Sequence, residues 1–202
     1  MKTRTALAAQ AMQGPSADRA AIVPAPDGSV VLVLADGATG VSGGAAAAQA
    51  VVDAVKAATE EGLDVRDAST WTGLLMGLEH GLDGETTAVI LTVWEGGAAG
   101  ASMGDSIAWR CDSAGLEDLT RRQGKARLGQ GSGAPVGFTT VKPGTFLLAS
   151  DGLWKHAAQS LIRAAALQPD LDRAAQALLQ LARLPNGQTH DDVTVALCRL
   201  DP

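Results

Sequence analysis

The sequence predicts an α+β fold in which antiparallel sheets carry helices on their outer faces. Short apolar runs bounded by Gly, Pro, Asn or Asp, which are typical of strands, stand in groups along the chain. Two pairs of segments with apolar residues at helical spacing separate these groups. The resulting order is strands, two helices, more strands, two helices and a closing strand, and this order favours antiparallel sheets with helices packed outside.

The first half of the chain is predicted as three strands followed by two helices. The run Val30 to Leu34 is apolar throughout, which indicates a strand buried on both faces. Ser69 is the expected cap of the second helix. In order, the expected elements are a strand near Thr3 to Met12, a turn at Gln13 to Ser16, a strand Ala20 to Val23, a hairpin loop Pro24 to Ser29, the strand Val30 to Leu34, and helices Gly43 to Glu60 and Ser69 to Leu82.

The second half is predicted as strands, a long loop, two helices and a last strand. The stretch Leu116 to Pro143 loses all periodicity and holds five glycines, so we expect a surface loop there. The other expected elements are strands Thr86 to Val93, Ile107 to Trp109, Thr145 to Ser150 and Val193 to Leu197, and helices Lys155 to Leu167 and Leu171 to Leu184.

Composition excludes several classes of protein. At 202 residues, with 46% hydrophobic residues and 24 glycines, residues 1–202 fit one compact domain. A net charge of −6 argues against nucleic acid as a partner. No apolar run approaches the roughly 18 residues of a membrane span, and the apolar part of the N-terminal stretch is too short for a signal peptide. Cys111 and Cys198 lie in apolar strand-like segments, so we expect buried free thiols and a reducing cytoplasm.

Acidic residues recur where predicted strands begin or end. Asp36 follows the most hydrophobic run in the chain, and no Lys or Arg lies between Arg19 and Lys56 to pair with it locally. A carboxylate at the end of a buried strand is costly without a partner, so a remote base or a metal ion is expected. The other acids at strand boundaries are Asp105, Asp151 and the pair Asp191-Asp192.

Five short motifs stand in order along the chain, namely Asp36 to Gly44, Glu85 to Ala88, Met103 to Ser106, Ser150 to Trp154 and Asp191 to Val195. Each motif alone is weak, whereas five in order, with Ser-Asp-Gly-Leu-Trp intact, are specific. Together they resemble the motifs of the metal-dependent protein phosphatases, the protein phosphatase type 2C group. The resemblance spans nearly the whole chain and implies a four-layer α-β-β-α sandwich of two antiparallel sheets flanked by helices.

The resemblance implies a site for two metal ions, with Asp36, Asp151 and Asp191 as the catalytic set. Asp36 would bridge the two ions, the Gly37 carbonyl would join one of them, Asp151 and Asp191 would complete the other, and Asp18 would act through bound water. Asp105 with Asp151 could hold a third, weaker ion. These ligands are hard oxygens, and the isolated His80, His156 and His190 offer no zinc spacing, so the expected ions are Mg²⁺ or Mn²⁺.

The chain departs from the family pattern at the presumed phosphate clamp and at the flap. If Asp18 ends the first motif of the family, Gln13 stands where the phosphate-gripping Arg is expected, and Ser16 replaces an Asn. Ala38 stands where some members have a His, and Asp192 replaces the usual Asn. Between Leu119-Thr120 and Pro135, only a short Gly- and Arg-rich stretch stands in place of the flap of larger members.

The expected function is metal-dependent hydrolysis of phosphoserine or phosphothreonine in proteins by a metal-activated water. The expected partners are a phosphorylated protein and a cognate serine/threonine kinase, with no membrane or nucleic acid, and the chain is expected to be a cytoplasmic monomer. The alternative is a catalytically weak or silent regulatory module that binds a phosphoprotein or kinase, which the loss of the Arg at Gln13 would suit. Phosphatase chemistry on a small metabolite is a third possibility.

Overall fold

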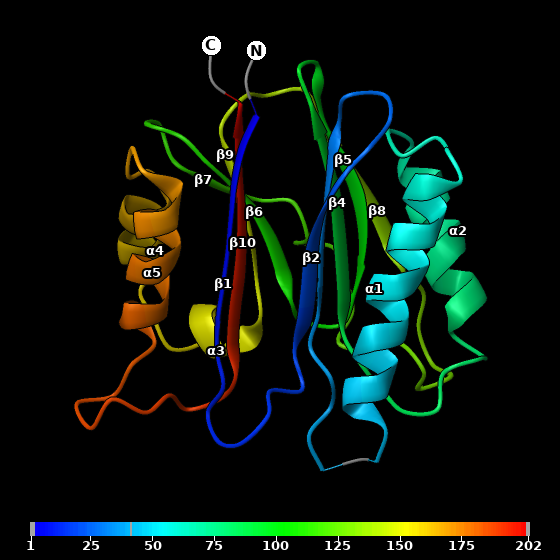
Figure 1. The fold of residues 1–202 in the computed structure, drawn as a ribbon, viewed down its shortest axis with the longest axis horizontal. Coiled ribbons are helices and arrows are strands. Elements are labelled where there is room, and N and C mark those ends of the chain that lie inside the picture. Colours follow the sequence, from blue (N-terminus) through cyan, green and yellow to red (C-terminus); the bar gives the residue numbers. More distant parts are fainter. Residues whose placement is uncertain (1–2, 41, 201–202) are drawn as a thin grey trace.

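Two antiparallel sheets lie face to face with helices on their outer sides, as the computed structural model shows for residues 3–40 and 42–200 (Figure 1). Each sheet has five strands, in the orders β1-β10-β9-β6-β7 and β2-β3-β4-β5-β8. The first sheet comprises β1 (Thr3–Gln10), β6 (Ile107–Cys111), β7 (Leu116–Asp118), β9 (Thr145–Ala149) and β10 (Val193–Leu200). The second comprises β2 (Arg19–Pro24), β3 (Val30–Ala35), β4 (Ala88–Trp94), β5 (Gly97–Met103) and β8 (Val136–Thr140).

The helices cover the outer faces of both sheets. The helices α1 (Gly44–Glu60) and α2 (Ala68–Leu78) lie on the second sheet, whereas α4 (Gln159–Ala166) and α5 (Leu171–Leu181) lie on the first (Figure 1). The short helix α3 (Asp151–Trp154) follows β9 directly. The four-layer α-β-β-α arrangement expected from the sequence is therefore confirmed.

The side chains of β3 point alternately to its two faces, and both faces are buried, which explains why its sequence is apolar throughout. Val31, Val33 and Ala35 pack under α1, whereas Leu32 and Leu34 face the opposite sheet. Side chains at alternate positions of a strand point to opposite faces, and here both faces are buried. The prediction of a strand buried on both sides is confirmed. The layer between the sheets also includes Phe146, Leu148 and Cys198.

Several predicted helix boundaries are wrong, including the predicted end of α5 at Leu184, since α5 ends at Leu181. The cap of α2 is Asp67 and not Ser69, because the Asp67 carboxylate accepts hydrogen bonds from both the backbone N–H and the hydroxyl of Ser69, at 2.8 and 2.6 Å. The helix ends at Leu78, four residues before the predicted Leu82. The predicted helix from Lys155 begins only at Gln159, since the preceding turn belongs to α3.

The stretch predicted as a surface loop, Leu116 to Pro143, contains two edge strands. The strand β7 pairs with β6, and β8 pairs with β5. Both are short and only partly buried, so neither carries the apolar run that would predict a strand. Between them, Leu128 is fully buried and pairs with Thr86 through two backbone hydrogen bonds of 3.0 and 2.8 Å.

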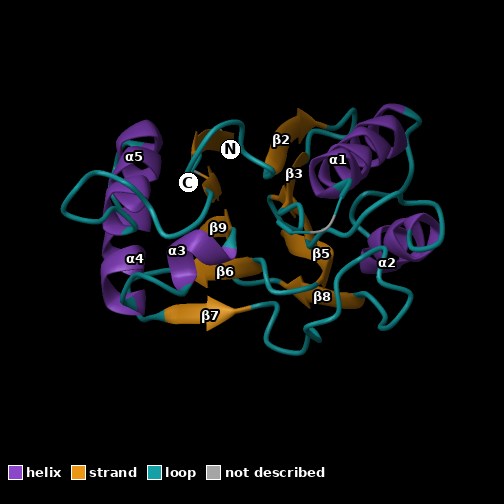
Figure 2. Ribbon diagram, turned by 90° about the horizontal axis from the view of Figure 1, so that it is seen from below, coloured by secondary structure: helices purple, strands orange, loops and turns teal. Residues whose placement is uncertain are grey.

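Several chain connections meet at one end of the sandwich. The β1–β2 and β3–α1 connections, α3, and the segment before β10 lie at the lower end in Figure 1, and Figure 2 shows this end face on. Cys111 and Cys198 are buried free thiols, as predicted. In the part of the chain that the structure describes, no helix is long and apolar enough to cross a membrane. Met1 and Lys2 of the expected N-terminal stretch and Val41 of the first motif lie outside the described residues.

Candidate functional site

Asp36 lies at the exit of β3 and is held by its backbone. Its N–H donates to the Thr87 hydroxyl at 3.1 Å, and its carbonyl accepts from the Thr87 N–H at 2.8 Å and the Thr86 hydroxyl at 2.9 Å. The next residue must be glycine, because a Cβ on Gly37 would lie 2.5 Å from the carbonyl oxygen of Gly44. The backbone contacts of Asp36 and the close approach at Gly37 therefore fix the position from which the carboxylate projects.

Asp151 and Asp191 lie on adjacent segments, and here too a glycine allows the backbones to approach closely. Asp151 begins α3, and the backbone of Ser150 before it is bound to Thr194 of β10 at 3.0 Å. A Cβ on Gly152 would lie 2.1 Å from the Asp192 carbonyl oxygen, so only glycine lets these two segments approach. Gly152 of the Ser-Asp-Gly-Leu-Trp motif thus brings Asp151 next to the Asp191-Asp192 pair.

Asp18 is only 7% exposed, and neither of its carboxylate oxygens has a hydrogen-bond partner among the described residues. The loop before it is held by Asp192, whose carboxylate accepts from the N–H of Met12 at 2.8 Å, the Ser16 hydroxyl at 2.7 Å and the N–H of Ala17 at 2.8 Å. Asp192 therefore positions the segment that carries Asp18. From the sequence, Asp192 is recognised only as a replacement of the usual Asn of the family pattern.

Asp105 is joined to Asp151 by a lysine. The Lys155 ammonium donates to Asp105 Oδ2 and to Asp151 Oδ2, each at 2.7 Å. The neighbouring Trp154 donates from its indole N–H to the Asp105 carbonyl at 2.9 Å. The expected approach of Asp105 to Asp151 is present, but a side-chain cation spans the two carboxylates where a third, weaker ion was expected. Sequence reasoning did not consider Lys155.

The aspartates act strongly on one another. Burial, and then the charges of Asp18, Asp151, Asp191 and Asp105, raise the pKa of Asp36 from 3.8 to about 9. Burial likewise raises the pKa of Asp18 to about 6, with the nearby hydroxyls of Thr194 and Ser150 opposing the shift. The pKa of Asp191 is also raised, chiefly by burial. Among the described residues, the main influences on the pKa of Asp36 are burial and the other aspartates, and no basic group is one of them.

The residues present fit divalent cations with a preference for oxygen ligands. Three buried carboxylate oxygens lack a partner among the described residues, namely both of Asp18 and Oδ1 of Asp151. Buried oxygens of this kind are unfavourable unless a donor or a cation satisfies them. Within residues 3–40 and 42–200, no three acidic, His or Cys side chains form a preassembled ligand cage. Bound ions would have to draw the carboxylates closer together than they stand here.

Gln13 and two arginines, Arg19 and Arg4, are the residues to consider as contacts for a phosphate group. Gln13 is exposed, so it does not provide a buried phosphate contact. Arg19 donates to the carbonyls of Ser16 and Asp18, each at 2.7 Å. Arg4 lies opposite Arg199 in the pairing of β1 with β10. It is six residues before Gln10, the end of β1 nearest the aspartates, which corresponds to about 20 Å at roughly 3.3 Å per residue.

The histidines are less isolated than the sequence suggested. The rings of His156 and His190 stack with their centroids 4.4 Å apart, beside Asp191. The charge of His156 acts against the raised pKa of Asp191. These two side chains therefore belong to the surroundings of the aspartates, although the sequence places them far apart.

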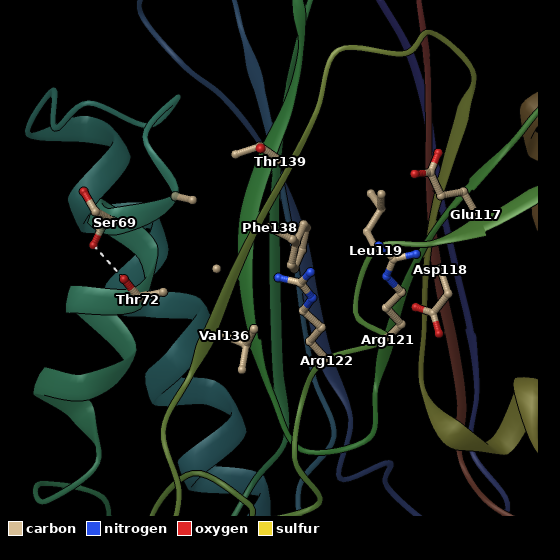
Figure 3. Close-up of a pocket in the computed structure, with 12 residues that line it drawn as sticks. Ser69, Thr72, Glu117, Asp118, Leu119, Arg121, Arg122, Val136, Phe138 and Thr139 are labelled. Atoms are coloured by element: carbon tan, nitrogen blue, oxygen red, sulfur yellow. Dashed lines mark hydrogen bonds between the residues drawn. The ribbon is translucent and has the colours of Figure 1, made fainter.

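The largest hollow near β8 lies away from the aspartates. Its volume is about 460 Å³, and Figure 3 shows Ser69 and Thr72 of α2 on one side, Phe138 of β8 in the middle, and Arg121 and Arg122 beside it. None of the expected metal ligands lines it. A smaller hollow of about 230 Å³ does reach Asp105, and it shares Asp118 and Arg121 with the larger one.

Known structures similar to this one are bacterial serine/threonine phosphatases. Stp1 from Staphylococcus aureus is 21% identical and superposes with a TM-score of 0.84 over 100% of this chain and 96% of its own. A bacterial serine phosphatase is 20% identical, with a TM-score of 0.85 over 99% and 98%. The catalytic domain of PstP, described in complex with two manganese ions, is 21% identical, with a TM-score of 0.79 over 98% and 97%.

These likenesses confirm the fold expected from the motifs. The shared fold covers nearly the whole length of both chains in each comparison. No family model matches the sequence, and no curated protein matches it either. At about a fifth identity, the comparisons establish the α-β-β-α architecture, and the chemistry of the site has to be argued from its own residues.

Proposed function

We propose that this chain is an Mg²⁺- or Mn²⁺-dependent protein phosphatase that hydrolyses phosphoserine and phosphothreonine. The observation that carries the proposal is the convergence of Asp18, Asp36, Asp151 and Asp191 from four separate segments at one end of the fold, with three buried oxygens that have no partner among the described residues. Four carboxylates that lie close together repel one another, and Lys155 contacts only Asp151 of the four, so their convergence favours a site built for cations. The similarity in fold to bacterial serine/threonine phosphatases supports the same function.

In this proposal, Asp36, Asp151 and Asp191 hold two ions, with the Gly37 carbonyl as a further ligand and Asp18 acting through water. Bound Mg²⁺ or Mn²⁺ would supply positive charge for the phosphate oxygens and activate a water molecule for attack on phosphorus. Thr86 and Thr87 hold the backbone of Asp36, and Asp192 holds the segment of Asp18. Because the pKa of Asp36 is raised to about 9, ion binding at neutral pH must release its proton.

The proposed substrate is a phosphorylated protein, with a serine/threonine kinase as the opposing enzyme. The similar proteins are named as serine/threonine phosphatases, which supports this substrate class. We further propose that residues 1–202 act as one catalytic domain, as a monomer, in the reducing cytoplasm that two buried free thiols suit. The alternative, a weakly active module that binds a phosphoprotein or kinase, is favoured by one observation: exposed Gln13 stands where a phosphate-gripping Arg was expected.

Hydrolysis of a phosphothreonine peptide with added Mn²⁺ tests the proposal. The unmodified protein should turn over the peptide, and EDTA should stop it. Asp36→Asn should lower kcat by about a hundredfold or more, since it removes a carboxylate that would hold the ions. Asp53→Asn is the matched control, because Asp53 is exposed on α1 and its partners among the described residues are Gln49 and Lys56. Equal turnover in both variants would contradict the proposal, and binding of the phosphopeptide without turnover would favour the regulatory alternative.

A further inference from the structure

Lys155 stands in an unusual place for a lysine, between two of the carboxylates at the proposed site. Its ammonium lies 2.7 Å from Asp105 Oδ2 and 2.7 Å from Asp151 Oδ2. The two partners come from different parts of the chain, one before β6 and one at the start of α3. A single ammonium with two carboxylates at this distance makes two charge-assisted hydrogen bonds.

The local backbone holds this arrangement together. Lys155 follows Asp151 by four residues at the end of α3, so its side chain reaches back along the helix to that carboxylate. Trp154 binds the carbonyl of Asp105 at 2.9 Å, and the Lys155 ammonium lies 5.5 Å from the centre of the Trp154 ring. Two consecutive residues therefore hold the backbone and the carboxylate of Asp105.

The two carboxylate oxygens of Asp151 have different surroundings. Its Oδ2 accepts from Lys155, whereas its Oδ1 is buried and has no partner in the described part of the chain. Asp151 also contributes to the electrostatic environment of Asp36. One oxygen is thus engaged by the ammonium, while the other remains available to a cation.

We propose that the Lys155 ammonium is a built-in cation that replaces a third metal ion between Asp105 and Asp151. This rests on the proposed function, because it concerns how many ions the same site holds. The ammonium already engages one oxygen of each carboxylate and offsets their negative charge. A divalent cation between Asp105 and Asp151 would therefore lack the ligands and the negative charge that it needs. The chain then binds two ions, and Asp105 has its partner whether or not metal is present.

Lys155→Met tests this by removing the ammonium while keeping most of the length of the side chain. Equilibrium dialysis against millimolar Mn²⁺ should find one more ion per chain in Lys155→Met than in the unmodified protein. Adding Asp105→Asn to Lys155→Met should abolish that additional ion. In EDTA, Lys155→Met should melt about 2 to 4 °C lower, the effect of two partly exposed ion pairs in a protein of this size. Mn²⁺ should then raise its melting temperature more than that of the unmodified protein.

Lys142→Met is the matched control. The Lys142 ammonium contacts Glu117 at 3.3 Å, remote from the aspartates, so its loss should leave the ion count unchanged. An equal ion count in Lys155→Met and the unmodified protein would overturn the inference. The count of additional ions is independent of turnover: if the unmodified protein hydrolysed no phosphopeptide, the proposed function would fail, while one more ion in Lys155→Met would still support the role of Lys155.

Discussion

Individual side chains at this site have roles that their neighbours in sequence do not reveal. Asp192 differs from its neighbour Asp191 in that its carboxylate accepts three hydrogen bonds from the β1–β2 connection. Lys155 contacts Asp105 across fifty residues of sequence. Such contacts depend on which segments the fold brings together. The acids at strand boundaries and the resemblance of the motifs pointed to the aspartates, but not to the residues that hold them.

The role of Asp192 gives a prediction about stability. Asp192→Ala leaves the N–H groups of Met12 and Ala17 and the Ser16 hydroxyl without their acceptor, so unfolding should become easier by about 2 to 3 kcal/mol. Asp192→Asn keeps one acceptor oxygen and should cost about half as much. Urea unfolding of both metal-free variants measures the difference. Equal stabilities for Asp192→Ala and the unmodified protein would show that these hydrogen bonds contribute nothing.

Elements with a long apolar run or a clear apolar face were predictable from the sequence, and several others were not. The strand β5 is buried at every position but was missed, because its sequence consists mostly of Gly, Ala and Ser. The strand β3 is buried on both faces and α1 has a clear apolar face, so both were predicted within one or two residues. The strands β7 and β8 each pair on one side only, and their residues are partly exposed, which leaves no pattern to recognise. The helix α3 has four residues, too few for a helical period to appear.

The segment between β7 and β8 is held in place and is not a free loop. Leu128 is fully buried and its backbone pairs with Thr86, whose hydroxyl supports Asp36. The carboxylate of Glu79 accepts from the N–H groups of Gly129 and Gly131, both at 2.8 Å. The segment therefore connects the end of α2 to the backbone beside the proposed metal site.

Leu128→Ala should lower the free energy of unfolding by about 2 to 5 kcal/mol, the cost of removing a buried Leu side chain. Leu161→Ala is the control, since Leu161 is 54% exposed on α4 and should change stability by less than about 1 kcal/mol. Chemical unfolding of the two variants decides between a packed segment and the surface loop predicted from the sequence. Similar small effects for both substitutions would favour the loop.

In the molecule as a whole, aspartates that repel one another lie at one end of the sandwich, whereas the layers between the sheets and helices are apolar. Three hydrophobic layers hold the sheets and helices together, so the fold can tolerate carboxylates whose pKa values are raised. The sequence predicted this division from acids at strand boundaries and apolar runs between them. It could not predict the size of the repulsion, which depends on how closely the connections meet.

The stability of the metal-free protein should therefore fall as pH rises. The pKa of Asp36 is raised from 3.8 to about 9 and that of Asp18 to about 6, so between about pH 4 and 9 the folded state binds more protons than the unfolded state. The stability that the metal-free protein has below about pH 4 is therefore lost as the pH rises through the folded-state pKa values of Asp18 and Asp36. Thermal melts in EDTA across the range should show the decline, and Asp36→Asn should flatten it and melt higher than the unmodified protein at about pH 8. Saturating Mn²⁺ should reverse the order of the two proteins, because cations then favour the ionised carboxylates. Parallel pH profiles in EDTA would rule out Asp36 as the source of the repulsion.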